Sequence, residues 1–235
     1  MMIRENITKS IVIIKRFFII FAAAFVSACT TINVDHIQIE NEVGLADGDA
    51  VVVLGRHHSA EFETEPTLIR CLSNRLRNGT DNLTIISEDE FVDQFYPWFE
   101  ARTAPLHPQK LQQTLAQPLV SQRIDELNIR FFVWVEGSTE RTGSAGSMAC
   151  SITPGGGGCF GFGTWEDTSE YETEVWNIET LREIARVSTD AVGTSYMPAF
   201  VIPVPLLARV EADACQGMGT QLVKFFQENQ PQAVE

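Results

Sequence analysis

Residues 50–55 read Ala-Val-Val-Val-Leu-Gly, a continuous apolar run. The turn-forming residues 47–49 precede it, and a polar loop follows from Arg56. A strand with one face in water alternates apolar and polar side chains, whereas this run does not alternate. The run therefore predicts a strand that is buried on both faces, in a sheet that is covered on both sides.

The segments that follow this strand extend the pattern. Residues 66–79 show the leucine spacing of a helix, with proline in the first turn and glycine at the end. Residues 83–86 and 130–136 are two further apolar runs of strand length, and helical stretches separate them. The order strand, helix, strand, helices, strand predicts a parallel core with crossover helices.

The last part of the chain departs from this pattern. Residues 165–178 alternate between polar and apolar positions, and residues 182–192 follow after a turn, which predicts an antiparallel hairpin. Apolar residues between Leu207 and Phe225 mark one face of a long helix. We therefore expect an α/β (α+β) fold: a mixed sheet of about five strands with a parallel β-α-β-α-β start, an antiparallel hairpin and a long C-terminal helix.

Other segments are expected to be irregular. Residues 29–49 are mostly polar and predict a tether, although the alternation from Ile32 to Ile39 also fits a short edge strand. Residues 138–163 predict a flexible glycine- and serine-rich insertion, and residues 193–203 an apolar connection. The expected organisation is a tether, a single domain over residues 50–229 and a loose tail over residues 230–235.

The N-terminus has the pattern of an export signal. Four Lys and Arg residues precede the apolar run of residues 17–26, and Val26-Ser27-Ala28-Cys29 follows. These four residues resemble the bacterial lipobox, which implies a signal peptide over residues 1–28 and a lipid, including palmitate, on Cys29. Thr30 in place of aspartate favours the outer membrane. The alternatives are a secretory signal with a chance cysteine and an uncleaved anchor helix.

The chain is strongly acidic. It has 17 Lys and Arg and 31 Asp and Glu. Without the leader, 13 basic and 30 acidic residues remain, which gives a formal charge of −17. Such a charge argues against a nucleic-acid partner and against a face pressed on anionic lipid. It suits a soluble body held off the membrane by a tether, and plain solubility is the simpler explanation of the charge, which we prefer.

The four cysteines after Cys29 are expected to lie in an oxidising compartment, where thiols can pair as disulfides. Cys150 and Cys159 bracket a short proline- and glycine-rich loop that can fold back, so we expect them to form a disulfide. Cys71 and Cys215 each lie in a predicted helix, and a disulfide between them would join the first helix to the last. Two buried free thiols are the alternative for this second pair.

Three segments carry a family resemblance: residues 51–54, residues 83–86 and the hairpin Val175-Trp176-Asn177-Ile178-Glu179-Thr180. They resemble the periplasmic α/β domain of curli-secretion-channel-type lipoproteins and the amino-terminal domain of the Tol-system propeller protein. This resemblance implies a domain used for protein–protein contact in the cell envelope, without a known active site. Residues 138–163 are too short and too rich in glycine to span a membrane as the channel members do, so the resemblance implies no pore.

One loop is a candidate ligand site. Arg56, His57 and His58 follow the first buried strand, and ligands of open α/β sheets bind at the carboxyl ends of such strands. A metal-dependent or hydrolytic periplasmic enzyme that uses His57 or His58 is therefore the alternative to a protein without catalysis. No catalytic residue, metal ligand or cofactor is assigned, because no further catalytic motif accompanies the loop.

Exposed aromatic residues are candidate partner contacts. Tyr96 and Trp98 lie in a dense aromatic cluster, and Phe160 and Phe162 lie in the glycine-rich insertion. The alternative for Tyr96 and Trp98 is a local core under a broken helix, and the alternative for Phe160 and Phe162 is packing on the sheet. A small-ligand carrier is a third hypothesis, which a deep pocket walled by Trp98, Trp134 or Trp176 would support.

These observations together predict a cell-envelope lipoprotein that faces the periplasm and acts by contact with another envelope protein or with itself.

Overall fold

The computed structural model describes residues 30–40, 43–56, 63–100, 103–105 and 108–230. The predicted signal peptide, Cys29, His57 and His58 lie outside the described residues. The described chain divides into two compact units. The first, here called the main unit, comprises residues 30–142, 166–193 and 209 onward; the second, here called the uncharged unit, comprises residues 143–165 and 194–208.

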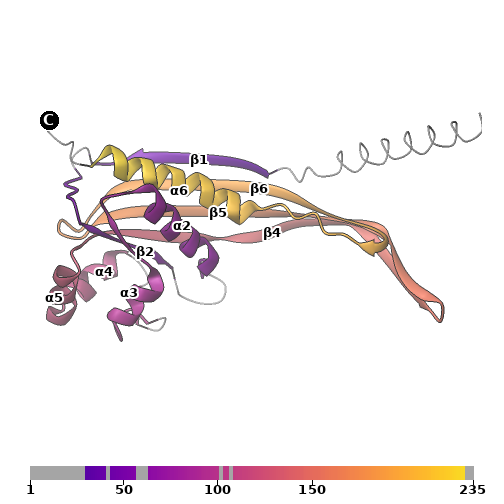
Figure 1. The fold of residues 1–235 in the computed structure, drawn as a ribbon, viewed down its shortest axis with the longest axis horizontal. Coiled ribbons are helices and arrows are strands. Elements are labelled where there is room, and N and C mark those ends of the chain that lie inside the picture. The colour runs from indigo at the N-terminus through magenta and orange to yellow at the C-terminus, as the bar shows by residue number, and fades with distance from the viewer. Residues whose placement is uncertain (1–29, 41–42, 57–62, 101–102, 106–107, 231–235) are drawn as a thin grey trace, which may run out of the picture. The chain divides into compact units, whose positions relative to one another are not determined.

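The sheet is mixed and its six strands follow the order β1-β6-β5-β4-β2-β3 (Figure 1). The strands are β1 (Thr30–Gln38), β2 (Ala50–Gly55), β3 (Thr84–Ile86), β4 (Ile129–Thr153), β5 (Gly156–Asn177) and β6 (Arg182–Pro203). β2 is parallel to both β3 and β4, and β1 is antiparallel to β6. The predicted α/β class with a parallel start is confirmed, with one strand more than the five that were expected.

Five described helices cover the sheet of the main unit. They are α2 (Pro66–Gly79), α3 (Glu88–Gln94), α4 (Pro108–Leu115), α5 (Pro118–Glu126) and α6 (Val210–Glu228). α2 and α6 lie on one side of the sheet, and α3, α4 and α5 lie on the other (Figure 1). In the part of the chain that the structure describes, no helix combines the length and the apolar character needed to cross a membrane.

β2 lies at the centre of this arrangement. Val51 and Val53 pack into the core beneath α2 and α6, whereas Val52 and Leu54 pack into a second core with α3, α4 and α5. Successive side chains of a strand point to opposite faces, so both cores meet across this one strand. All four side chains are buried, which confirms the burial on both faces that the unbroken apolar run predicts.

β1 corrects the predicted tether. Residues 30–38 pair with β6 over their whole length, from Thr30 opposite Gly193 to Gln38 opposite Ala185. Val34 packs against the first core, and the His36 ring meets the Phe225 ring of α6 with 6.0 Å between centroids. The edge strand that the alternation predicts is therefore present, because α6 offers an apolar surface to one face of this segment.

The glycine-rich insertion and the proline-bearing connection also differ from expectation. Residues 138–163 continue β4 and β5 on both sides of a tight turn, and residues 193–203 continue β6. Glycine weakens a strand but does not prevent pairing when neighbouring strands supply the hydrogen bonds. At Gly137 the backbone has φ +123°, and a Cβ atom there would collide with the carbonyl oxygen of Glu170, so this position requires glycine.

Both expected cysteine pairs are disulfides in the structure. Cys71 of α2 and Cys215 of α6 are joined with an S–S distance of 1.95 Å across 144 positions of sequence. Cys150 of β4 and Cys159 of β5 are joined with an S–S distance of 2.00 Å across 9 positions. The first disulfide therefore fastens the two helices on one side of the main unit, and the second closes the hairpin of the uncharged unit.

Candidate functional site: an open acidic face of the sheet

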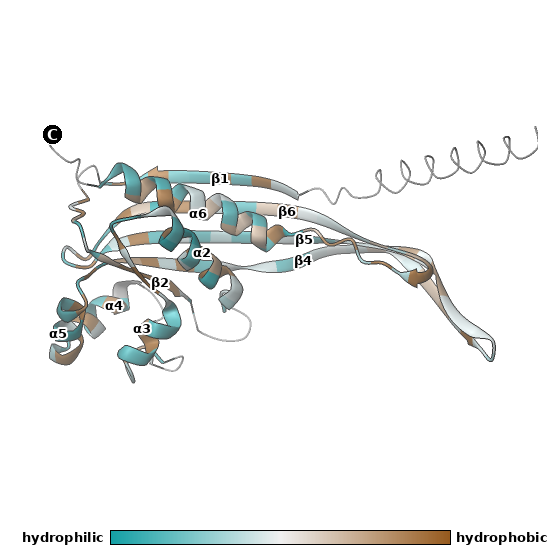
Figure 2. Ribbon diagram, in the orientation of Figure 1, coloured by the Kyte–Doolittle hydropathy of each residue, from teal (hydrophilic) through white to brown (hydrophobic). Residues whose placement is uncertain are grey.

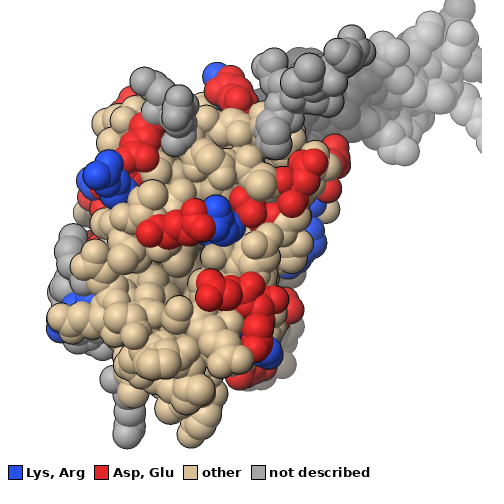
Figure 3. All heavy atoms as spheres, turned by 90° about the vertical axis from the view of Figure 1, so that its left-hand side faces the viewer, with Lys and Arg blue, Asp and Glu red and all other residues tan. Residues whose placement is uncertain are grey.

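The outer face of the main unit is formed by strand side chains that point away from α2 and α6. On β5 these are Glu170, Glu172 and Glu174, which alternate with the buried residues Tyr171, Thr173 and Val175. On β6 they include Arg186, Ser188 and Asp190. This alternation leaves one polar face and one apolar face on the same two strands. Asp and Glu are more abundant than Lys and Arg on the side of the molecule drawn in Figure 3.

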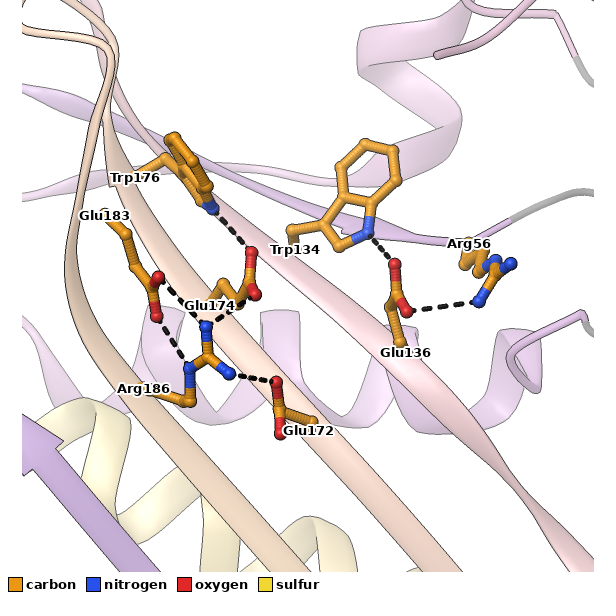
Figure 4. Close-up of polar contacts among 8 residues, drawn as sticks. All are labelled: Arg56, Trp134, Glu136, Glu172, Glu174, Trp176, Glu183 and Arg186. Carbon is orange, nitrogen blue, oxygen red and sulfur yellow. Dashed lines mark hydrogen bonds and ion pairs between the residues drawn. The ribbon is translucent and has the colours of Figure 1, made fainter. Parts of the chain in front are cut away.

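Arg186 organises the centre of this face (Figure 4). Its guanidinium donates to Glu172 at 2.8 Å, to Glu174 at 2.9 Å and to Glu183 at 2.7 Å. The hydrogen bond with Glu183 is the main cause that raises the pKa of Arg186, and the negative charges of Glu183, Glu172 and Glu174 add to it. Burial is the main cause that raises the pKa of Glu174, and the carboxylates of Glu183 and Glu172 add to it. One cation thus holds three carboxylates in a fixed arrangement.

Two indole groups fix further carboxylates at the border of the face. Trp176 Nε1 donates to Glu174 at 2.9 Å, and Trp134 Nε1 donates to Glu136 at 3.0 Å (Figure 4). Glu136 also accepts a hydrogen bond from Arg56 at 3.1 Å. Trp134 belongs to the core with α3, α4 and α5 and Trp176 packs against it, so each indole connects a packed ring to a surface charge.

A shallow hollow of about 490 Å³ lies beside these groups on the outer face. Carboxylates of Glu136, Glu140, Glu170, Glu172 and Asp190 line it together with Arg56. General acid–base catalysis needs a proton donor or acceptor within reach of a substrate, and nucleophilic catalysis needs a nucleophile beside a base. The contacts of this face instead pair carboxylates with arginine and indole groups, which suits recognition by charge.

A buried polar network lies on the opposite side of β5. Glu65 accepts hydrogen bonds from the Tyr171 hydroxyl at 2.9 Å and from the Thr139 backbone at 2.7 Å. The hydroxyl groups of Thr139 and Ser169 lie 2.7 Å apart, and those of Thr139 and Tyr171 lie 2.8 Å apart. Burial is the main cause that raises the pKa of Tyr171. Because each group has a partner, this network connects the start of α2 to β4 and β5.

The predicted ligand loop is described only in part. Arg56 is near the carboxyl end of β2 and reaches the outer face through Glu136. His57 and His58, which the enzyme hypothesis requires, lie outside the described residues. Within the described ranges, no group of three or more His, Cys, Asp or Glu side chains is arranged to hold a metal ion.

The predicted aromatic contacts fall into two groups. In the main unit, Tyr96 is 67% exposed, whereas Trp98 packs against the second core and donates to Gln117. Phe160 and Phe162 are exposed and belong to the uncharged unit. Trp98, Trp134 and Trp176 line neither the acidic hollow nor the groove of about 920 Å³ between α2 and α6, so neither cavity is the tryptophan-walled pocket of the carrier hypothesis.

Sequence reasoning missed the role of Arg186. Strict alternation from the turn after Asn177 would place Arg186 opposite Thr173, on the face that α6 covers. Ile184 and Ala185 are adjacent and both buried, so the alternation of β6 shifts by one residue at this point. A local irregularity of this kind leaves little trace in the sequence, and the excess of glutamate on β5 is the only signal that a cation is needed.

No protein-family model and no curated protein sequence matches the chain. Among solved structures, the PelC dodecamer from Paraburkholderia phytofirmans is similar with 11% identity and a TM-score of 0.40, over 84% of this chain and 98% of that chain. A variant of the same dodecamer has 11% identity and a TM-score of 0.39, over 83% and 96%. An overlap at this level supports no shared activity or partner.

Proposed function

We propose that the chain is a lipid-anchored cell-envelope protein that acts by protein–protein contact, in an accessory, assembly or scaffold role, without catalysis. The observation that carries this proposal is the outer face of β5 and β6, which combines fixed negative charge with open access. The export-signal pattern and Cys29 in the sequence support a contact at the envelope, on the periplasmic side and at the outer membrane.

The charge of the outer face indicates the chemistry of its partner. Five carboxylates and one arginine line its hollow, and a second copy of the same face would be repelled by like charge. A basic surface of another envelope protein is complementary to it. Arg186 and the two indoles hold the carboxylates in place before binding, so little side-chain entropy is lost when the partner docks.

Cross-linking in cells tests this contact. A photoreactive residue in place of Ser188, which lines the hollow, is expected to capture a protein, whereas the same residue in place of the exposed Gln216 on α6 is not. The double variant Glu170→Lys and Asp190→Lys is expected to abolish the adduct at Ser188. An adduct that survives this charge reversal, or that forms equally at Gln216, would contradict the proposed face.

The anchor has a separate test. Palmitate labelling of the chain is expected to disappear in Cys29→Ala, and labelling that continues in this variant would remove the anchor from the proposal.

A further inference from the structure

The uncharged unit differs from the main unit in composition. Residues 143–165 and 194–208 contain no Asp, Glu, Lys, Arg or His, although the whole chain has 48 charged residues, namely 17 basic and 31 acidic. Figure 2 draws these segments mainly in white and brown, whereas much of the main unit is teal. The two units therefore expose surfaces of different chemistry, one charged and one without charge.

Large apolar side chains of this unit are exposed. Ile152 is 94% exposed, Phe200 is 80% exposed and Phe160 is 69% exposed. Val201 and Ile202 are more than half exposed as well. Phe200 and Val201 line one hollow of about 390 Å³ together with Phe160. These side chains therefore belong to one connected apolar surface of the unit.

The unit is nevertheless built as an ordered structure. The Cys150–Cys159 disulfide joins its two hairpin strands. The Phe160 and Phe200 rings meet with 5.7 Å between centroids, and the Phe162 and Tyr196 rings meet with 6.1 Å. These contacts leave the apolar side chains exposed on a paired backbone, whereas a loop that only connects strands is usually polar.

The pairing of Thr30 supplies a second, independent observation. Thr30 pairs with Gly193, and residue 194 is the first residue of the uncharged unit on β6. Cys29 immediately precedes Thr30, so no spacer separates the proposed lipid from the strand. Phe200 lies seven positions after Gly193, so the distance between them is at most roughly 25 Å along a fully extended chain. The uncharged unit therefore begins on β6 at the residue directly after the partner of Thr30.

From these observations we propose that the uncharged unit enters the interfacial layer of the lipid bilayer. The bilayer is the proposed neighbour because the proposed lipid on Cys29 directly precedes Thr30, which pairs with Gly193. The absence of charge removes the large cost of taking ionised groups into lipid. In the part of the chain that the structure describes, residues 143–153 pair with β5 alone, so their open backbone edge favours the headgroup boundary over the hydrocarbon core.

Tryptophan probes in the full-length lipidated protein test this proposal. Which membrane the unit enters follows from the anchor under the proposed function, on which this inference rests in that respect. Phe200→Trp and Ile152→Trp place a probe at two exposed positions of the uncharged unit, and Leu119→Trp is a matched control on α5 of the main unit, where Leu119 is 65% exposed. Each protein is reconstituted into phosphatidylethanolamine and phosphatidylglycerol vesicles with and without brominated acyl chains. Circular dichroism checks the fold of each variant.

The emission of the two probes in the uncharged unit is expected to fall in brominated vesicles beyond the loss of the unsubstituted protein, and that of the control is not. Equal loss at all three positions, no loss at the first two, or failure of the protein to float with vesicles would overturn the proposal. Cross-linking between copies by a photoreactive residue in place of Phe200, together with an unquenched Phe200→Trp, would assign the surface to self-association instead. Palmitate labelling reports the anchor separately, so quenching without labelling would refute the anchor and leave this inference in place.

Discussion

The main unit and the uncharged unit share three strands, yet the surfaces of the two units differ in kind. In the main unit, β5 and β6 carry buried apolar side chains on one face and an ordered set of carboxylates on the other. In the uncharged unit, the same strands carry exposed apolar side chains and no charge. Strand pairing is thus continuous along the sheet, whereas side-chain composition decides which environment each part of it meets.

The two disulfides show the same contrast. Cys71 and Cys215 close a long loop between α2 and α6, and Cys215 is buried in the first core. Cys150 and Cys159 close a short loop within one hairpin. Closing a loop lowers the conformational entropy of the unfolded chain, and this loss grows with the length of the loop, so the first disulfide acts on the whole main unit and the second acts locally.

Removal of the first disulfide is expected to have the largest effect. The chain-entropy model gives about 5 kcal/mol for a loop of this length and about 3 kcal/mol for the short one. The double variant Cys71→Ala and Cys215→Ala is expected to lower the free energy of unfolding of the main unit by about 3–5 kcal/mol in urea. The double variant Cys150→Ala and Cys159→Ala, as the matched control, is expected to leave that transition in place. Similar shifts in both variants would contradict the division into a main unit and a locally closed hairpin.

A smaller effect is expected from the loss of Arg186. Its side chain is 34% exposed, so Arg186→Ala is expected to cost about 1 kcal/mol of unfolding free energy at pH 7. Without the cation, the carboxylates of Glu172, Glu174 and Glu183 repel one another in the folded state. The folded state of the variant then binds protons more readily, so the deficit is expected to shrink as the pH falls below about 5, where carboxylates become protonated.

Urea unfolding at pH 7 and at pH 4.5 measures this difference. Arg182→Ala is the control, because Arg182 lies on the same strand, is 72% exposed and makes one contact of 3.4 Å with Glu40. A deficit of Arg186→Ala that is independent of pH would mean that lost packing, and not charge, explains it.

The sequence predicts the centre of this fold well and its margins poorly. The unbroken run of residues 50–55 is enough to place β2 between two cores, because hydrophobic burial on both faces leaves no other arrangement. The strand extensions over residues 138–163 and 193–203 could not be read from composition, since glycine, serine and proline predict turns when pairing partners are unknown. The sequence does not decide between a tether and an edge strand for β1 for the same reason, because the apolar surface of α6 that covers this strand comes from the far end of the chain.

The candidate sites follow the same rule. The short loop between them predicts the Cys150–Cys159 disulfide, and elimination leaves Cys71 and Cys215 as the second pair, with two buried free thiols as the alternative; both disulfides are confirmed. The alternation of residues 165–178 predicts a strand with one polar face, which β5 has. The three-carboxylate contact of Arg186 depends on a shift of one residue at Ile184 and Ala185, which only the folded strand reveals. The sequence predicts Phe160 and Phe162 as aromatic contacts. The proposal that their uncharged surroundings contact lipid also needs the pairing of Thr30 with Gly193, which only the structure shows.

The central claim is that the two units meet different neighbours: the outer face of the main unit meets a protein, and the uncharged unit meets lipid. One photoreactive residue, placed in living cells either at Ser188 or at Phe200 of the full-length chain, tests this claim most directly. Mass spectrometry is expected to find protein adducts at Ser188 and phospholipid adducts at Phe200. Protein adducts at Phe200, or phospholipid adducts at Ser188, would contradict the account.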